Sequence, residues 1–248
     1  MQNIKLKIFA GGLAALSLIA PQTATGQADS VGVLSYGTRL APVVVAGALL
    51  SYGILSHTVE PFESIDRAVN DWALRANRHT KVDDYLQYAP AVAVFGFDLC
   101  GVKAKHNLRD RAFVTAGSYL LSTLAVQAVK HTVSVARPDG AADNSLPSGH
   151  TATAFTGAHI LFREYGATRP WIGIAGYAAA TSTGIMRVMN RRHWLGDVAA
   201  GAGTAIACVE ASYLLLPVFR KIIKASDNVA VAPIAGGGYV GAGLVCWF

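Results

Sequence analysis

Six apolar stretches, separated by more polar segments, constrain this chain more than any other feature of its sequence. Each is long enough for several turns of helix, and all are rich in Ala, Gly, Ser and Thr, which let helix backbones approach closely inside a membrane. We therefore expect an all-α fold, a six-helix bundle that passes several times through a membrane. The stretches cover 40–55, 85–102, 112–129, 151–162, 171–186 and 198–219.

The composition narrows the class of protein further. Apolar residues make up 52% of the chain and charged residues 15%, and the mean hydropathy is +0.37. Several stretches are nevertheless shorter than the ~20 residues of a membrane span, so a soluble or peripheral bundle with an apolar core is an alternative. The net charge of +6 is spread between the stretches, which argues against nucleic-acid binding because dispersed charge makes no phosphate-tracking groove.

Both ends of the chain differ from the helical domain, which we place at 29–224. Two lysines precede an apolar run over 8–20, and small residues follow it. This pattern predicts an export signal over 1–28, with an uncleaved membrane anchor as the alternative. The Gly-rich tail over 225–248 holds two apolar runs around a GGG turn, which predicts a β-hairpin that packs on the bundle or associates with the outer membrane.

The segment over 57–84 separates the first two apolar stretches and mixes acidic with basic side chains. Its apolar residues recur at helical spacing, which predicts an amphipathic helix over the bundle. These residues are Phe62, Ile65, Val69, Trp72 and Leu74.

The three cysteines lie far apart in apolar surroundings, as Cys100, Cys208 and Cys246. Such spacing fits neither a disulfide framework nor a zinc site, and it indicates small core residues.

Basic residues gather in three loops on one side of an alternating helix path. Positive loops stay in the cytoplasm, so the segments 132–149 and 187–196 should face the periplasm. A cleaved signal would instead start residues 29–39 in the periplasm and reverse this orientation. Either the signal stays, one helix fails to span, or the protein is not integral. The basic residues are Lys103, Lys105, Arg109 and Arg111, then Arg163 and Arg169, then Arg220, Lys221 and Lys224.

The first motif with chemical character is KHTVSVARP, which holds Lys130 and Arg137. A guanidinium matches the geometry of phosphate oxygens and an ammonium acts as a point charge, so the pair can clamp an anion. Taken alone, such residues at a helix end more often reach toward the membrane interface.

The second motif, PSGH, opens the fourth apolar stretch. Ser148 and the N–H of Gly149 can bind an anion at this helix start, assisted by the helix dipole. His150 would then lie beside the anion, where it can transfer a proton. A lone histidine at this place would more often cap the helix or lie in the core.

The third motif, RVMNRRHWLGD, holds His193 and Asp197 at i, i+4 spacing. On a helix these residues share one face, so the carboxylate can hold one ring nitrogen as N–H and leave the other as a nucleophile. Arg187 supplies a third cation. An ordinary helical His–Asp pair is the alternative interpretation.

Other catalytic chemistries lack their signatures in this sequence. It contains no HExxH, no cysteine pair, no GxSxG elbow and no phosphate-binding Walker loop. Three cations around one site would repel a divalent ion, so we expect neither a metal nor a cofactor. His131, His159, Asp139 and Asp143 have no assigned role and are interpreted as loop or core residues.

Taken together, the three motifs resemble the signature of the type-2 phosphatidic acid phosphatase and vanadium haloperoxidase superfamily in order and spacing. The resemblance covers about 112–217 and extends loosely to the six-helix plan. One departure is Met186, which stands where the family usually has Ser before the third-motif Arg. That change removes a hydrogen-bond donor from the site but no catalytic group.

The resemblance implies roles for the motif residues. His193 would attack phosphorus and form a phosphohistidine, with Asp197 orienting it, and His150 would protonate the leaving oxygen. The equatorial oxygens would be held by Lys130, Arg137, Ser148, the Gly149 amide and Arg187.

The resemblance and the export signal together favour a lipid phosphomonoester or pyrophosphate as substrate, with lipid A as the single best candidate. They imply an inner-membrane protein whose active site faces the periplasm, with a periplasmic or outer-membrane location as alternatives. A soluble nonspecific acid phosphatase is the runner-up. A vanadate-dependent haloperoxidase and a noncatalytic transport or scaffold protein are weaker alternatives, the latter because the charged residues gather in the motifs.

Overall fold

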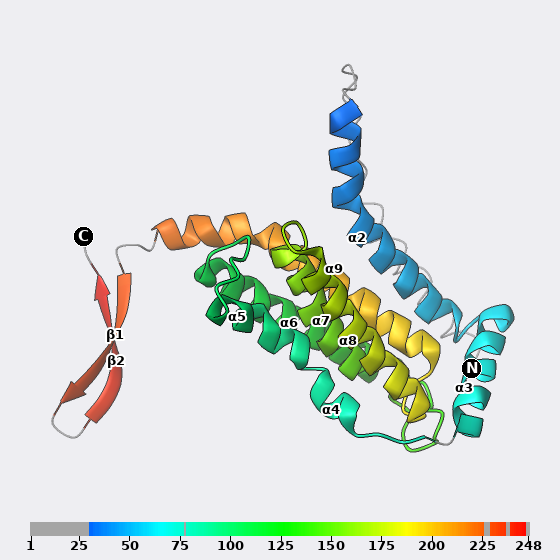
Figure 1. The fold of residues 1–248 in the computed structure, drawn as a ribbon. Coiled ribbons are helices and arrows are strands. Elements are labelled where there is room, and N and C mark those ends of the chain that lie inside the picture. Colours follow the sequence, from blue (N-terminus) through cyan, green and yellow to red (C-terminus); the bar gives the residue numbers. More distant parts are fainter. Residues whose placement is uncertain (1–29, 77, 226–228, 237–238, 247–248) are drawn as a thin grey trace.

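The computed structural model describes residues 30–76, 78–225, 229–236 and 239–246, and the expected export signal lies outside them. The all-α prediction is confirmed, but the count of six helices is too low: the described residues form eight, because the segment over 57–84 contributes two (Figure 1). The helices are α2 (Ser30–Leu55), α3 (Glu60–Ala76), α4 (Val82–Leu86), α5 (Ala89–Leu99), α6 (Leu108–Thr132), α7 (Gly149–Tyr165), α8 (Pro170–Met189) and α9 (Leu195–Ala225).

Helix α7 is the centre of the bundle and packs against α5, α6, α8 and α9. Most of its residues are buried, since small and apolar side chains lie on nearly every side of it. Its C-terminal half joins the main apolar core, formed by Val94, Val114, Ile160, Leu161, Tyr165, Ile172, Val209, Tyr213 and Leu216. The core therefore fixes one end of α7 and leaves its N-terminal end for polar chemistry.

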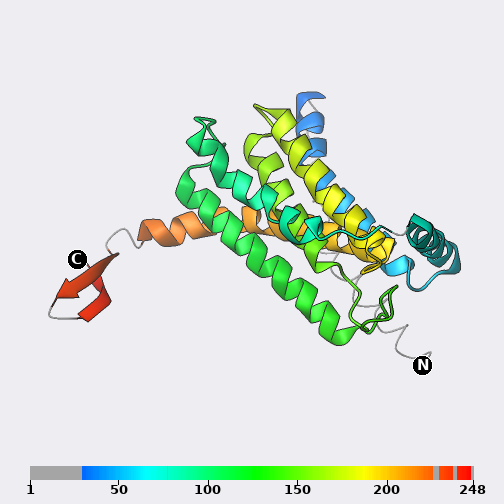
Figure 2. The same cartoon turned by 60° about the horizontal axis from the view of Figure 1, so that its bottom comes forward.

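The three sequence motifs meet at the other end of the bundle. There α6 ends, α7 begins and α8 turns into α9 (Figure 2). Close packing of α9 on the start of α7 depends on Gly201, because a Cβ atom there would lie 2.5 Å from the backbone oxygen of Ser148. A larger residue at this position would push the two motif-bearing segments apart.

Helix α2 runs antiparallel to α9. A Cβ on Gly53 would lie 2.6 Å from the Cβ of Ala200, and one on Gly203 would lie 2.9 Å from Leu50 Cγ. Because α9 begins at the motif end of the bundle, α2 must end there. The turn from α2 to α3 is thereby brought beside the third motif.

The prediction that α3 lays its apolar side on the bundle is wrong for three of its residues. Ile65, Trp72 and Leu74 are 45%, 51% and 51% exposed, whereas Asp66 and Ala73 are buried. The cause is a hydrogen bond that the Asp66 carboxylate accepts from the Gly196 N–H at 3.1 Å. This bond holds the side of α3 that carries Asp66 against α9.

Among the residues that the structure describes, two helices are long and apolar enough to cross a membrane, α6 over Leu108–Thr132 and α9 over Leu195–Ile222. A third span results if α2 and α3, bent by 86° at their junction, are counted as one. By length and composition, the structure therefore contains candidate membrane spans, but fewer than the six helices that the sequence suggested. Helix α5, with 11 residues, is among those too short to span.

In the tail, strand β1 (Val229–Gly236) pairs antiparallel with β2 (Tyr239–Cys246). The register places Gly236 opposite Tyr239 and Val229 opposite Cys246. Figure 1 draws this pair beyond the C-terminal end of α9.

The prediction that the cysteines are core residues is wrong for Cys100, which is exposed. Cys100 follows the last residue of α5 and is its C-cap, so it lies at a loop and not inside the bundle. Cys208 on α9 is partly buried.

Candidate active site

A cavity of about 640 Å³ opens at the motif end of the bundle. Most of the predicted site residues line it, and the remaining two, Ser148 and Asp197, are fully buried next to residues that do. The lining residues are His79, Thr80, Lys81, Asp83, Asp84, Lys130, Arg137, Gly149, His150, Arg187, Asn190, Arg192 and His193.

Three cations predicted to bind an anion converge on this cavity, each from a different part of the chain. Lys130 lies in the last turn of α6 and donates from Nζ to the carbonyl of Asn144. The Nε–H groups of Arg137 and Arg187 are buried and have no partner within the described residues. Buried N–H groups are nearly always hydrogen-bonded, so both are available to an anionic ligand.

The predicted helix start at PSGH is confirmed, since Ser148 is the N-cap of α7. Its hydroxyl accepts a hydrogen bond from Thr151 Oγ1 at 2.9 Å, and its own N–H donates to the Asp197 carbonyl at 2.9 Å. Ser148 therefore fixes the start of α7 against α9. The hydroxyl is fully buried and is not part of the cavity lining, unlike the neighbouring Gly149.

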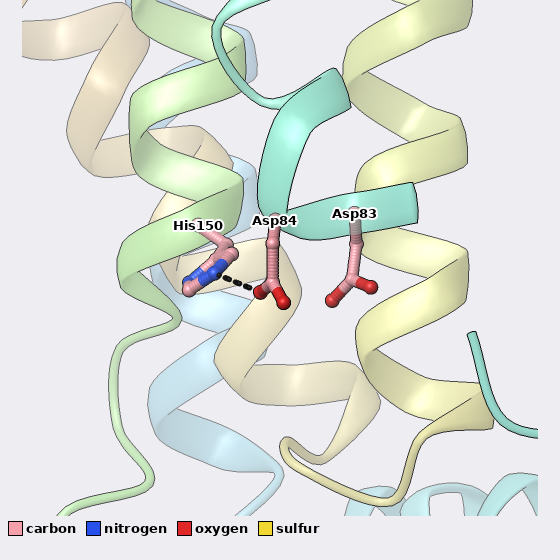
Figure 3. A group of neighbouring side chains, drawn as sticks. All are labelled: Asp83, Asp84 and His150. Carbon is pink, nitrogen blue, oxygen red and sulfur yellow. Dashed lines mark hydrogen bonds and ion pairs between the residues drawn. The ribbon is translucent and has the colours of Figure 1, made fainter. Parts of the chain in front are cut away.

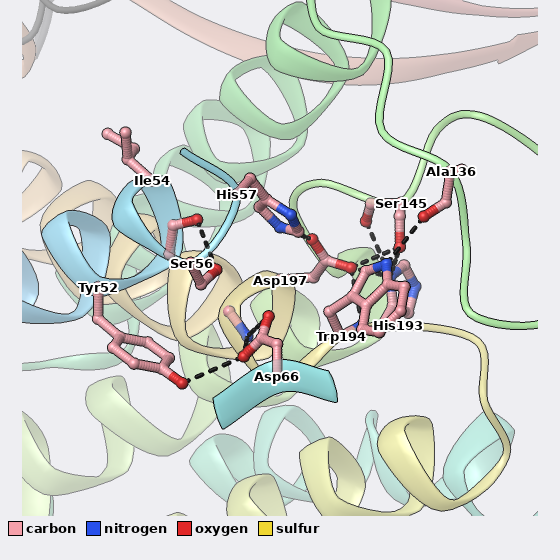
Figure 4. Close-up of polar contacts among 12 residues, drawn as sticks. Tyr52, Ile54, Ser56, His57, Asp66, Ala136, Ser145, His193, Trp194 and Asp197 are labelled. Atoms are coloured by element: carbon pink, nitrogen blue, oxygen red, sulfur yellow. Dashed lines mark hydrogen bonds and ion pairs between the residues drawn. The ribbon is translucent and has the colours of Figure 1, made fainter. Parts of the chain in front are cut away.

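His193 is buried and held on one side of its ring (Figure 4). Its Nδ1 lies 2.8 Å from the backbone oxygen of Ser145. Because a carbonyl oxygen can only accept a hydrogen bond, Nδ1 must carry the proton in this contact. The neutral ring then has its lone pair at Nε2.

The predicted helical pairing of His193 with Asp197 is wrong in its geometry. Helix α9 begins at Leu195, so His193 precedes it and the two residues share no helical face. Asp197 Oδ2 lies 3.6 Å from His193 Nδ1, but it accepts hydrogen bonds from Ser145 Oγ at 2.5 Å and the Trp194 N–H at 2.8 Å. The carboxylate thus fixes the loops on both sides of the ring.

Sequence reasoning missed His57, which follows α2. Its Nε2 lies 2.9 Å from Asp197 Oδ1, the carboxylate oxygen that faces away from His193. Gly196 allows this approach, because a Cβ there would lie only 1.7 Å from Ser56 Oγ. A histidine 140 residues away thereby shares the Asp197 carboxylate.

Sequence reasoning also missed two carboxylates of α4, Asp83 and Asp84 (Figure 3). Asp84 Oδ1 lies 2.9 Å from His150 Nε2, and Asp83 Oδ2 lies 2.7 Å from Arg187 Nη1. Both belong to the polar segment over 57–84, where the only signal in the sequence was an acidic pair next to a basic residue.

The electrostatic surroundings lower the pKa of both histidines. For His193 the main cause is burial, which disfavours the charged ring, and Arg187 and Lys130 add to it, while Asp197 opposes them. For His150 burial is again the main cause, with Arg187 next, while Asp84 and Asp83 act in the other direction. Both rings therefore favour the neutral form more than a solvated histidine does.

Asp83, Asp84 and His150 each offer a ligand atom, all within 4.8 Å of one another. A metal ion between them would meet a cation that is already in place, since Arg187 Nη1 lies 2.7 Å from Asp83 Oδ2 and 3.9 Å from Asp84 Oδ1. Repulsion by that guanidinium makes this group a poor divalent-ion site.

Part of the chain is similar to known proteins. Residues 111–221 match the family model described as the PAP2 superfamily. Over 137 residues the chain is 41% identical to the Lipid A 1-phosphatase of Porphyromonas gingivalis, a match that covers 54% of this chain and 31% of that protein. The chain thus spans about a third of the length of this curated relative.

Two solved structures also resemble the chain. The crystal structure of Aquifex aeolicus LpxE has 21% sequence identity and a TM-score of 0.46, over 61% of this chain and 93% of that one. The first transmembrane PAP2 type phosphatidylglycerolphosphate phosphatase from Bacillus subtilis has 19% identity and a TM-score of 0.45, over 74% of this chain and 98% of that one.

Proposed function

We propose that this chain, whose residues 111–221 match the PAP2 superfamily model, is a phosphatase that releases phosphate from a lipid phosphomonoester or pyrophosphate without a metal. The observation that carries the proposal is one cavity in which His150 and His193 face a common group of cations. One imidazole with a free lone pair can attack phosphorus, and a second can protonate the leaving oxygen.

The cations and the start of α7 bind the phosphate group. Arg137 and Arg187 each have a buried Nε–H without a protein partner among the described residues, Lys130 adds a point charge, and the Gly149 N–H points from a helix N-terminus. These groups stabilise the negative charge on the equatorial oxygens, and they do so most strongly in the transition state. Ser148 supports them by fixing the helix start.

His193 is the proposed nucleophile. The Ser145 carbonyl holds the proton at Nδ1, so Nε2 keeps the lone pair that attacks phosphorus. As the N–P bond forms, positive charge develops on the ring, and the Asp197 carboxylate 3.6 Å away stabilises it. The product of this step is a phosphohistidine.

His150 is the proposed acid. It donates a proton to the leaving oxygen as the O–P bond breaks, which releases the dephosphorylated alcohol or lipid phosphate. The neutral ring then accepts a proton from water, whose oxygen attacks phosphorus and displaces His193. Phosphate leaves, and both histidines return to their starting protonation states.

The substrate we propose is a phosphorylated lipid, with lipid A as the first candidate. The 41% identity to a protein named Lipid A 1-phosphatase supports this choice. Helices α6 and α9, which are long and apolar enough to cross a membrane, support a site close to a bilayer. Both helices have one end at the cavity, so a lipid headgroup could reach it without leaving the membrane.

We propose that the cavity faces the periplasm from the inner membrane. The element order places the basic loops between α5 and α6 and between α7 and α8 at the end of the bundle away from the cavity, and positive loops favour the cytoplasm. Because α2 runs antiparallel to α9, its start lies on the basic side too.

Trapping the covalent intermediate tests the mechanism. The purified protein is mixed with a radiolabelled phosphate ester and quenched in alkali, where phosphohistidine survives. We expect label on the peptide that contains His193 in the wild type and none in the His193→Ala variant. Label on a serine or aspartate peptide would contradict the proposal. Turnover should persist in EDTA and fall with vanadate, which mimics the trigonal bipyramidal phosphate.

The substrate is tested separately, by mass spectrometry of lipid A and phospholipids from cells with and without the gene. We expect one fewer phosphate on lipid A when the gene is present. An unchanged phosphate count on lipid A, with a change in another lipid, would transfer the assignment to that lipid.

A further inference from the structure

Helix α4, which precedes the PAP2 superfamily domain, supplies a carboxylate to the acid side of the cavity. We propose that Asp84 is a positioning residue that orients His150 and stabilises its protonated form for proton donation. This inference rests on the proposed function, since it assumes that His150 is the acid. It adds a residue that lies outside the three motifs and before the family domain.

The contact between the two side chains determines which nitrogen reacts. Asp84 Oδ1 lies 2.9 Å from His150 Nε2, so the ring donates to the carboxylate through Nε2 (Figure 3). Nδ1 is then the nitrogen left to face the leaving oxygen. A carboxylate that orients an imidazole in this way also stabilises the positive charge on the ring.

The backbone around Asp84 is anchored firmly enough for such a role. Asn190, at the end of α8, bonds to Thr80 twice, accepting from its N–H at 2.9 Å and donating to its carbonyl at 2.8 Å. Asn190 Nδ2 also donates to Asp83 Oδ1 at 3.1 Å. The segment that leads into α4 is therefore fixed to the third motif through Asn190.

The two neighbouring carboxylates have different partners. Asp83 is buried and its Oδ2 accepts from Arg187 Nη1 at 2.7 Å, so it holds the guanidinium. Asp84 Oδ1 is 3.9 Å from the same nitrogen and is closer to His150. Asp84 can therefore act on the imidazole without giving up a bond to Arg187.

The charges around His150 explain why a carboxylate is needed there. Arg187 faces the ring from α8 and, together with burial, disfavours its protonated form, while Asp83 and Asp84 of α4 offset this. The other charged residues of the cavity are Lys81, Lys130, Arg137 and Arg192. Without Asp84, a cavity rich in cations would keep His150 neutral over more of the pH range.

Proton donation moves one proton from His150 to the leaving oxygen. The Nδ1–H bond of His150 breaks, an O–H bond forms on the leaving group, and the ring becomes neutral while Nε2–H stays bonded to Asp84. The water that later attacks the phosphohistidine returns a proton to Nδ1. Asp84 keeps its charge throughout and never binds the substrate.

The test compares two leaving groups in the full-length protein. An alkyl phosphate needs a proton on its leaving oxygen, whereas p-nitrophenyl phosphate releases a stable anion and hardly needs one. General acids contribute ~10²–10⁴-fold to rate, so an acid that is misoriented and less often protonated should cost about 10- to 100-fold in kcat/KM on the alkyl ester. This ratio reports phosphoryl transfer to His193 and not the later hydrolysis of the phosphohistidine, which both esters share. We expect the Asp84→Asn variant to lose this much on the alkyl phosphate and less than about threefold on p-nitrophenyl phosphate.

A second readout is the basic limb of the pH profile, which should move to lower pH in Asp84→Asn because the imidazolium loses its carboxylate. The Asp71→Asn variant, which removes an exposed carboxylate of α3 outside the cavity, is the matched control and should leave both readouts unchanged. Equal losses on both esters, or an unmoved basic limb, would overturn the role of Asp84.

The His150→Ala variant separates failure of this inference from failure of the proposed function. It should show the same selectivity between leaving groups as Asp84→Asn, with a larger loss, and adding Asp84→Asn to it should cost little more. If His150→Ala is selective and Asp84→Asn is not, only the role of Asp84 is refuted. If His150→Ala shows no selectivity, His150 is not the acid and both proposals fall.

Discussion

The two histidines of the cavity are held in opposite ways. The His193 side chain is 3% exposed, and its Nδ1 and the adjacent Asp197 are fixed by backbone and side-chain groups from several segments. The His150 side chain is 30% exposed, and its partner Asp84 is 51% exposed on a helix of five residues. We call His193 and Asp197 with their partners the closed half of the site, and His150 with Asp84 the open half.

This difference in exposure matches the proposed chemical roles, nucleophile for His193 and acid for His150. A nucleophile must keep one tautomer and one direction, which a buried network of hydrogen bonds provides. An acid must regain a proton in every cycle and release a product, which requires contact with water. The comparison therefore predicts that changes in the closed half abolish turnover of every ester, whereas changes in the open half depend on the leaving group and on pH.

The largest expected effect is that of His193→Ala. Without a nucleophile no phosphohistidine forms, so kcat should fall by at least about 10⁴-fold, on the alkyl and nitrophenyl esters alike. Phosphate release measures turnover, and circular dichroism in detergent shows whether the helices remain. Retained turnover in a folded variant would show that His193 is not the nucleophile.

Asp197→Asn should have the second largest effect. The amide would turn an NH₂ group toward His57, Ser145 or the Trp194 N–H, all of which now donate to the carboxylate. We expect a loss of about 10²–10³-fold in kcat, because the developing charge on His193 loses its partner. Unfolding free energy should fall by about 1–3 kcal/mol, the cost of unpaired buried polar groups.

Measuring both quantities sharpens the comparison. Denaturant unfolding and phosphate release are followed on the same preparation, with Asp71→Asn as the exposed control. A variant that is destabilised but turns over normally would show that the Asp197 network holds the fold and not the nucleophile.

Much of the site could be predicted from the sequence, because each motif is local. Lys130, Arg137, His150, Arg187 and His193 line one cavity since each lies at the end of an apolar helix or in the loop next to it, and alternating helices bring those ends together. The start of α7 was predictable for the same reason, as a Ser N-cap leaves a local signature.

The contacts that His57 and Asp84 make in the site could not be predicted, because they join distant segments. His57 and Asp197 are 140 residues apart, and Asp84 and His150 are 66 apart. The i, i+4 spacing of His193 and Asp197 suggested a helical pair, but α9 starts between them. Periodicity could not show that α3 turns Asp66 inward, since a hydrogen bond to Gly196 decides it.

The pH dependence of the wild type is the third prediction. His193 must be neutral to attack, so activity is lost as pH falls through its pKa, and His150 must be protonated to donate, so activity is lost as pH rises through its pKa. Burial lowers both pKa values below the ordinary 6.5. We therefore expect kcat/KM for an alkyl phosphate to peak below pH 6.5 and to fall up to about tenfold per unit above the pKa of His150.

The nitrophenyl ester provides the control for that profile. It needs little help from an acid, so its basic limb should be shallow while its acid limb stays. An optimum above pH 7 for the alkyl ester would mean that the open half does not supply the proton.

The smallest expected effect belongs to His57, which touches the closed half and lies outside residues 111–221, the part that matches the family model. His57→Phe keeps a ring of similar size but removes the donor to Asp197 Oδ1, and we expect kcat to fall about 3- to 10-fold because the carboxylate is less firmly placed. The loss should be equal on both esters, KM should hardly change, and His57→Gln, which can still donate, should recover part of it. The control is His131→Phe, at an exposed histidine outside the cavity. A loss confined to the alkyl ester would place His57 with the acid and erase the division between the two halves.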